Sequence, residues 1–128
     1  MLNLNTLHGI IAGAESIYGV TDNGDGSYRV DLVAGGSRLA TAAEILTAVK
    51  ASKIDDMNAE VRTRLIARYG TAEEQVSRAL GVYGVAEQEA MAAGIAATID
   101  SSNVAQNAIL AATDAATVEA VTVAWPVI

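Results

Sequence analysis

The chain has 128 residues, a net charge of −7 and no cysteine. A chain of this length is one compact domain at most, with or without an extended arm, and its acidic balance lacks the basic footprint that nucleic-acid binding requires. Without cysteine it forms neither disulfides nor thiolate metal sites. No stretch approaches the ~18 clean apolar residues of a membrane span, so we expect no nucleic-acid and no membrane partner.

Apolar residues make up 52% of the chain, and phenylalanine is absent. Alanine dominates this apolar fraction, and each alanine buries little area, so the core is thin. A small chain with a thin core often needs partners to bury enough surface. We therefore expect a homo-oligomer.

Residues 1–14 show no sustained hydrophobic period. Leu2 and Leu4 alternate with asparagines, a pattern that suits a short strand or an extended arm. His8 is the only histidine, and no second one exists to share a metal or a proton. We interpret it as a surface or packing residue.

A β-hairpin is predicted next. Its strands are Ser16–Thr21 and Ser27–Val33, and Asp22–Gly26 between them supplies residues that tolerate positive φ. The acidic turn also suggests calcium binding, but Gly24 and Gly26 stand where an EF-hand loop needs ligands. A plain hairpin turn is therefore favoured.

The Gly-Gly-Ser stretch within Ala34–Ser37 is interpreted as a flexible joint. It lacks the spacing of a phosphate-binding loop. It separates an N-terminal arm and hairpin, residues 1–36, from a helical domain with a C-terminal extended tail, residues 37–128.

The stretch from Thr41 to Gly70 is predicted to be helical. Thr41 and Glu44 form a capping box, in which the hydroxyl and the carboxylate each satisfy a free backbone N–H. Gly70 can take the left-handed conformation that ends a helix.

Apolar side chains form one long stripe on the later part of this stretch. The apolar residues before Lys50 point to a different side, and Ser52 with Asp55 can cap a fresh helix. The sequence leaves open one bent helix or two helices that meet near Ala51–Ser52. We assign the stripe, together with the Trp near the C-terminus, to a subunit interface: Ile54, Met57, Val61, Leu65, Tyr69 and Trp125.

Shorter helices are predicted after Gly70. Thr71 with Glu74 forms a second capping box, and the helix that it opens breaks at Gly81–Gly84. Another helix starts near Ala86, and Asp100–Asn103 either ends it or caps the next one.

The last predicted turn of helix covers residues 115–120, after Thr113 and Asp114. Val121–Trp125 is β-prone, and Pro126 forbids a helix there. A strand at this end could pair with the hairpin of this chain or of a neighbour. The expected fold is mainly α with a small β-hairpin (α+β), in which a long amphipathic helix precedes short helices and an extended C-terminal segment.

No set of side chains points to catalysis. Asp55 and Asp56 are adjacent and point ~100° apart on a helix, and the carboxylates near Glu73 and Glu87 stand where the helix dipole favours them. A single histidine completes neither a Ser-His-Asp triad nor a pair of Glu-x-x-His motifs. We expect no catalytic, cofactor-binding or metal-binding residues and no enzymatic activity.

Four segments form one further pattern: Ala48–Lys53, Arg64–Gln75 (RLIARYGTAEEQ), Ala108–Thr113 (AILAAT) and Val121–Pro126 (VTVAWP). Together they resemble small structural proteins of tailed bacteriophages, which are often described as tail-fibre or other virion-associated proteins. The likeness covers about residues 45–128 and leaves the hairpin out.

The resemblance implies a non-enzymatic virion protein, assembled in the host cytoplasm. It would form a homo-oligomer in the tail, fibre, collar or capsid surface and would contact other virion proteins. The resemblance offers no catalytic residues. An alternative is a bacterial helical adaptor or regulatory protein that binds a protein partner in a groove between helices.

Overall fold

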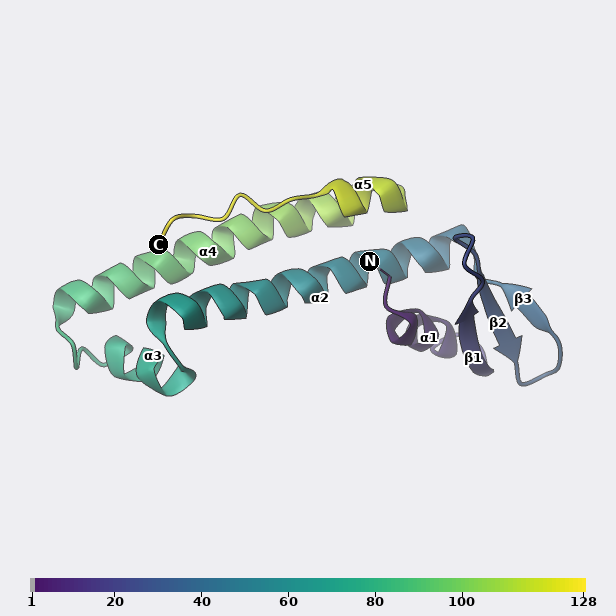
Figure 1. Cartoon of the computed structure of the whole chain (residues 1–128), viewed down its shortest axis with the longest axis horizontal. Helices are drawn as coiled ribbons and strands as arrows, with labels where there is room; N and C mark the ends of the chain where they lie inside the picture. Colours follow the sequence, from purple (N-terminus) through teal and green to yellow (C-terminus); the bar gives the residue numbers. More distant parts are fainter. Residues whose placement is uncertain (1) are drawn as a thin grey trace. The chain divides into compact units, whose positions relative to one another are not determined.

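The computed structural model describes residues 2–128, which are mostly helical with a small antiparallel sheet, as predicted. The elements, in chain order, are α1 (Leu4–Ala12), β1 (Ile17–Asp22), β2 (Tyr28–Leu32), β3 (Ser37–Leu39), α2 (Ala42–Tyr69), α3 (Ala72–Ala79), α4 (Val85–Ala111) and α5 (Ala115–Ala120) (Figure 1). Residues 121–128 follow without regular secondary structure. The α+β fold class is confirmed.

These elements fall into two compact units. Unit 1 contains the described residues up to Ile54, together with Ile109–Ala120, and unit 2 contains Asp55–Ala108 and Val121–Ile128. Helices α2 and α4 each begin in one unit and end in the other. The domain boundary predicted between residues 36 and 37 implies that the two sides fold independently of each other. That independence stays a prediction.

The N-terminal segment is a helix, so the expected strand or extended arm is wrong. The Asn3 side chain caps α1 by accepting a backbone N–H two residues ahead. Leu7 and Ile11, one helical turn apart, are both fully buried. The alternation of leucine and asparagine is too short to impose a strand. The i,i+4 spacing of Leu7 and Ile11 favours a helix because the sheet covers this helical face.

The predicted hairpin is confirmed, with β1 and β2 antiparallel and Val20 opposite Val30. In its turn Gly24 and Gly26 have φ of 83° and 89°. The two turn aspartates each accept a backbone N–H from two residues ahead, at 2.8 and 3.0 Å. Their carboxylates therefore hold the turn itself.

The flexible joint expected at Ala34–Ser37 is wrong, because this stretch is a second hairpin turn. Gly35 and Gly36 take positive φ, and Ser37 begins β3, which pairs with β2 in an antiparallel sheet of order β1-β2-β3. A three-residue strand is too short to show the alternation by which strands are read from sequence. The core of unit 1 lies between this sheet, α1 and the start of α2: Leu7, Ile11, Val30 and Ala48.

Of the two possibilities for residues 41–70, the structure shows one uninterrupted helix, α2. The Thr41–Glu44 capping box is present, with N–H···O distances of 2.8 and 3.1 Å, and Gly70 takes a φ of 88°. Ser52 caps nothing: its buried hydroxyl accepts a hydrogen bond from Asn3 N at 3.1 Å. Ser52, which suggested a break in the helix, thus forms a tertiary contact instead.

Helix α3 begins at its predicted cap, where Thr71 accepts the Glu74 N–H at 3.3 Å. Helix α4, by contrast, runs through Asp100–Asn103, so the break or fresh cap expected there is wrong. Ser102 is buried and accepts a hydrogen bond from Gln106 Nε2, one turn on, at 3.1 Å. Burial of this face outweighs the weak helix propensity of serine and asparagine.

Helix α5 begins as predicted after Asp114, whose carboxylate accepts the Thr117 N–H at 2.7 Å. The extended C-terminal segment is present, but within this chain it forms no strand with the hairpin. It belongs to unit 2, whereas the sheet belongs to unit 1. Pairing with a neighbour's hairpin stays a prediction.

Candidate functional site

Unit 2 contains an antiparallel helix pair, formed by the second half of α2 and by α4. Gln106 Nε2 donates to Asn58 Oδ1 at 3.1 Å, and farther along α2 Tyr69 packs on Gly94. Tyr69 is 2% exposed, and a Cβ on Gly94 would collide with its hydroxyl oxygen. The glycine therefore permits the close approach of the tyrosine ring to α4.

The interface residues predicted on α2 contribute in part to packing inside the chain. Met57 and Tyr69 are buried. Trp125 is half-buried, and the guanidinium carbon of Arg64 stands 4.6 Å from its ring centroid. The remaining three are half-buried: Ile54, Val61 and Leu65. A buried side chain reaches a partner only after rearrangement, and the assignment of the six residues to a subunit interface stays a prediction.

Apolar side chains point into solvent around the connection from α3 to α4. Exposure ranges from 54% for Tyr83 to 77% for Leu80. Two of these residues lie between the positive-φ glycines Gly81 and Gly84, where a turn usually carries polar side chains. We call this surface the turn patch: Val76, Leu80, Val82, Tyr83 and Val85.

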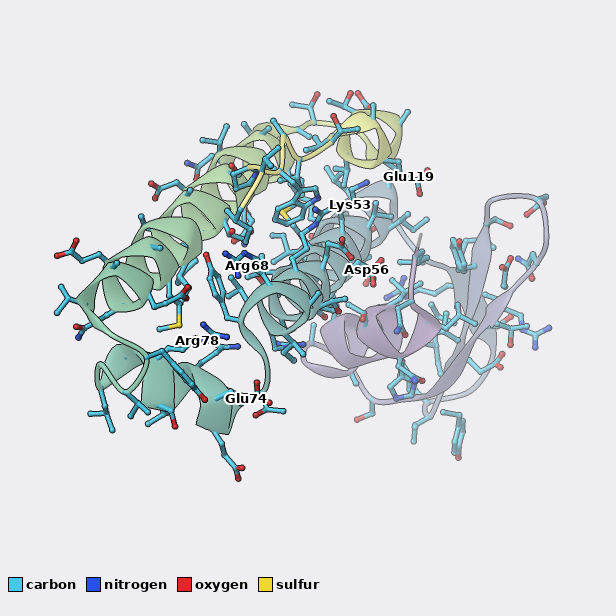
Figure 2. The ribbon with its side chains drawn as sticks, turned by 60° about the vertical axis from the view of Figure 1, so that its left-hand side comes forward. Lys53, Asp56, Arg68, Glu74, Arg78 and Glu119 are labelled. Atoms are coloured by element: carbon cyan, nitrogen blue, oxygen red, sulfur yellow. The ribbon has the colours of Figure 1, made fainter. Side chains whose placement is uncertain are left out.

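Polar contacts hold the backbone beneath the turn patch. Arg78 Nε donates to the Tyr69 carbonyl at 3.2 Å, and its Nη1 donates to Glu87 Oε2 at 2.8 Å. Gln88 Nε2 donates to the Ala79 carbonyl at 2.6 Å. Figure 2 shows Arg78 between α3 and the end of α2. The connection is thus fixed by hydrogen bonds, the Arg78 guanidinium carbon stands 5.0 Å from the Tyr83 ring centroid, and the apolar side chains remain more than half exposed.

A second feature of unit 2 is a groove on α4 in which the C-terminal residues lie. The cavity left there has a volume of about 340 Å³. Its floor on α4 consists of small residues, among them Ala93, Gly94 and Ala97, and Pro126–Ile128 forms another wall. The absence of large side chains on this face lets an extended chain approach the helix closely.

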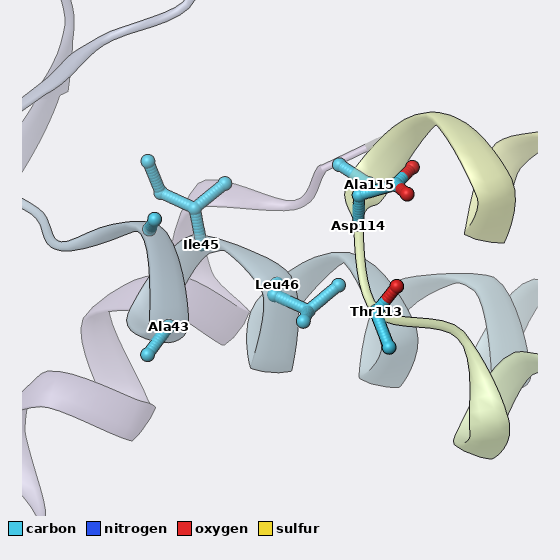
Figure 3. A pocket seen from close by; sticks show the side chains of 7 residues that line it. Ala43, Ile45, Leu46, Thr113, Asp114 and Ala115 are labelled. Atoms are coloured by element: carbon cyan, nitrogen blue, oxygen red, sulfur yellow. The ribbon is translucent and has the colours of Figure 1, made fainter.

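Unit 1 has a groove of its own, of about 470 Å³, between the first turns of α2 and the chain that enters α5 (Figure 3). Ile45 and Leu46 line it from α2, and Thr113–Ala115 lines it from the other side. The apolar residues that precede Lys50, which the sequence placed on a different side from the α2 stripe, thus border this groove.

The lysines of α2 bind the carbonyl oxygens of other helices. Lys50 Nζ donates to the Leu110 carbonyl at 2.9 Å, and Lys53 Nζ donates to the Glu119 carbonyl at 3.2 Å (Figure 2). These carbonyls lie in the last turns of α4 and α5, where free acceptors and the helix dipole favour a cation. The basic residues in this part of α2 therefore serve as helix caps.

An ion-pair cluster in unit 1 joins β3, the start of α2 and the connection from α1 to β1. Arg38, on β3, donates to both carboxylate oxygens of Glu44 at 2.8 and 3.0 Å and to Glu15 Oε1 at 2.7 Å. The hydrogen bonds from Arg38 hold the pKa of Glu44 at about 2, below its ordinary value of 4.5. The same bonds raise the pKa of Arg38. This bidentate pair fixes the end of the sheet to the start of α2.

Within residues 2–128, no three His, Cys, Asp or Glu side chains are grouped so that they could hold a metal ion. None of the helices described is long and apolar enough to span a membrane. No family model, curated protein or solved structure matches this chain.

Sequence reasoning missed the turn patch and the partner of Trp125. The segment Gly81–Val85 did carry a signal, because Val82 and Tyr83 are apolar residues in a turn bounded by glycines. Arg64 carried none, since it lies 61 positions from the tryptophan that it covers.

Proposed function

We propose that this chain is a non-enzymatic structural subunit of a tailed-bacteriophage virion, which assembles with copies of itself in the tail, fibre, collar or capsid surface. The sequence resemblance supports the virion setting. The observation that supports self-assembly is the exposure of the turn patch. Its apolar side chains are exposed although polar contacts hold the connection beneath them.

The area of the turn patch suits a subunit contact. A fully buried apolar side chain contributes ~1.5–3 kcal/mol at ~25 cal/mol per Å², which corresponds to ~60–120 Å². On that scale the exposed fractions of the five side chains correspond to roughly 200–400 Å². The largest apolar patch of a typical monomer is ~300–600 Å² and is often functional. A standard interface buries ~800 Å² on each partner, so the turn patch supplies about a quarter to a half of one side.

Charge supports a second copy as the partner. Glu73 and Glu89 lie three and four residues from the turn patch along the chain, whereas Glu87 is paired with Arg78. Two such patches facing each other would therefore bring like charges together. A groove of about 200 Å³ between α2 and α3 instead presents Leu65 and Ile66 beside Arg62. The patch of one copy against this groove of the next is a head-to-tail contact, which generates rings or fibres.

The test compares two equally exposed valines of unit 2. Val82 lies in the turn patch and is 67% exposed, and Val104 lies on α4 outside it and is 72% exposed. We expect light scattering behind size exclusion to give a multiple of 13.1 kDa for the native chain and for Val104→Asp. Val82→Asp should fall toward a single chain, because a buried, unpaired carboxylate costs several kcal/mol.

Two results would count against the proposal. A native chain that stays at 13.1 kDa at every concentration rules out self-assembly in isolation. A Val82→Asp variant that keeps the native mass removes the turn patch from the interface.

A second candidate function, a helical adaptor that binds a protein partner, is favoured by the unit 1 groove beside Ile45 and Leu46. Apolar grooves of this kind accept amphipathic helices. An adaptor would be monomeric alone, and Leu46→Asp would abolish its partner binding while Val82→Asp would leave it unchanged.

A further inference from the structure

The C-terminal tail, residues 121–128, is held in unit 2 without hydrogen bonds. Among the residues that the structure describes, none donates a hydrogen bond to this segment or accepts one from it. Every other connection in unit 2 has backbone or side-chain hydrogen bonds, as at Gly70 and Gly84. Of its contacts with the described part of the chain, the tail therefore depends on those between side chains.

Two contacts fix the tail. The Arg64 guanidinium carbon stands 4.6 Å from the centroid of the Trp125 ring, which is a cation–π contact. Ile128 lies over Gly94, where its Cγ2 is 3.5 Å from the position that a glycine Cβ would take. One contact is made with α2 and the other with α4. Any tail of the same sequence can therefore form both contacts if the groove is open.

The connection to the tail lies outside regular secondary structure. Helix α5 ends at Ala120 in unit 1, and the chain enters unit 2 at Val121 without regular structure. At the other two places where the described chain passes between the units it does so inside a helix, α2 or α4. Rotation about the backbone at Ala120–Val121 breaks no hydrogen bond of the tail.

We propose that the tail exchanges between copies, so that Val121–Ile128 of one chain lies on α2 and α4 of its neighbour. The proposal rests on the homo-oligomer proposed above. The exchanged tail makes the same contacts with Arg64 and Gly94 as the tail of the same chain, so exchange costs little enthalpy. A flexible link keeps a segment at an effective concentration in the mM range, and a closed assembly supplies neighbouring tails at similar concentration.

The native chain has no cysteine, so introduced pairs report on the tail cleanly. We would mix two single variants, Ala97→Cys in the groove and Ile128→Cys on the tail, dissociate and reassemble them together, oxidise, and separate the products without reductant. Neither variant can close a disulfide within one chain. A mixed dimer therefore joins two chains, and a yield above that of a control variant places the tail of one chain in the groove of another.

A matched control uses Ala92→Cys, an exposed alanine on the opposite face of α4. We expect abundant mixed dimer with Ala97→Cys and little with Ala92→Cys. Equal yields from both variants would mean random collision and would overturn the exchange.

Two measurements distinguish the remaining outcomes. They are disulfide formation in the double variant Ala97→Cys/Ile128→Cys and the solution mass of the native chain. An oligomer whose double variant closes only within single chains overturns the exchange and leaves self-assembly intact. A monomer that closes within single chains overturns both proposals. A double variant that forms no disulfide at all shows that the tail does not lie in this groove, which also overturns the exchange.

Discussion

Replacing Gly94 with alanine sets two opposing effects against each other. Gly94 lies inside α4, and alanine has the higher helix propensity by ~1 kcal/mol. The new Cβ, however, would collide with the hydroxyl oxygen of Tyr69 and stand 3.0 Å from its Cζ. The Tyr69 ring is 2% exposed, so it cannot move aside without disturbing the α2–α4 packing.

The steric effect should prevail. Overpacking a closely packed site costs ~1–3 kcal/mol, and a contact with a buried ring belongs at the upper end of that range. After subtraction of the propensity gain we expect Gly94→Ala to lower the free energy of unfolding by about 2 kcal/mol. Gly9→Ala is the matched control, because Gly9 lies in α1 with nothing within 4 Å of its Cβ position. It should raise stability by ~0.5–1 kcal/mol.

Urea unfolding followed by circular dichroism at 222 nm measures both changes. The change Tyr69→Phe removes the colliding oxygen, so Gly94→Ala should cost less in that background, and a double-mutant cycle isolates the coupling. If Gly94→Ala is as stable as the native chain or more stable, Tyr69 does not lie against Gly94 and the register of the helix pair is wrong.

Two further predictions concern single contacts. Glu44, with a pKa lowered to about 2 from 4.5, stabilises the fold fully above pH 4.5 and loses that contribution as the pH falls toward 2. The lowered pKa corresponds to at most ~3 kcal/mol, and with partial solvent exposure we expect about 1–2 kcal/mol. Acid titration by circular dichroism should show this loss in the native chain and in Glu73→Gln but not in Glu44→Gln; equal curves for all three contradict it. Trp125 is the only tryptophan, so Arg64→Ala should shift its emission to longer wavelength and increase acrylamide quenching, whereas Arg62→Ala should change neither. An unaltered spectrum in Arg64→Ala refutes the stacking.

The turns and helix caps were predictable because they depend on residues a few positions apart. Thr41 with Glu44, Thr71 with Glu74 and the aspartates of the first turn all bind backbone groups within three residues. Such contacts need no distant partner, so a short motif is enough to indicate them. The hairpin, α2, α3 and α5 were therefore located correctly.

The errors fall where distant residues decide the local structure. Helix α1 forms because Leu7 and Ile11 are buried in a core with Val30 and Ala48, and α4 continues through Asp100–Asn103 because Ser102 is buried. Ser52 suggested a helix start but instead binds Asn3, 49 positions away. Local propensities differ by less than ~1 kcal/mol per residue, so burial readily overrides them.

The candidate sites show the same contrast between features set by nearby residues and features set by distant ones. The sequence by itself determined which residues are apolar, where α2, α3 and α5 begin, and that the last segment, with Trp125 and Pro126, is extended. Only the tertiary structure decided that Met57 and Tyr69 are buried, that Arg64 covers Trp125, and that the turn patch remains exposed. The physical reason is that exposure depends on which other segments cover a side chain, and those segments are distant in the sequence.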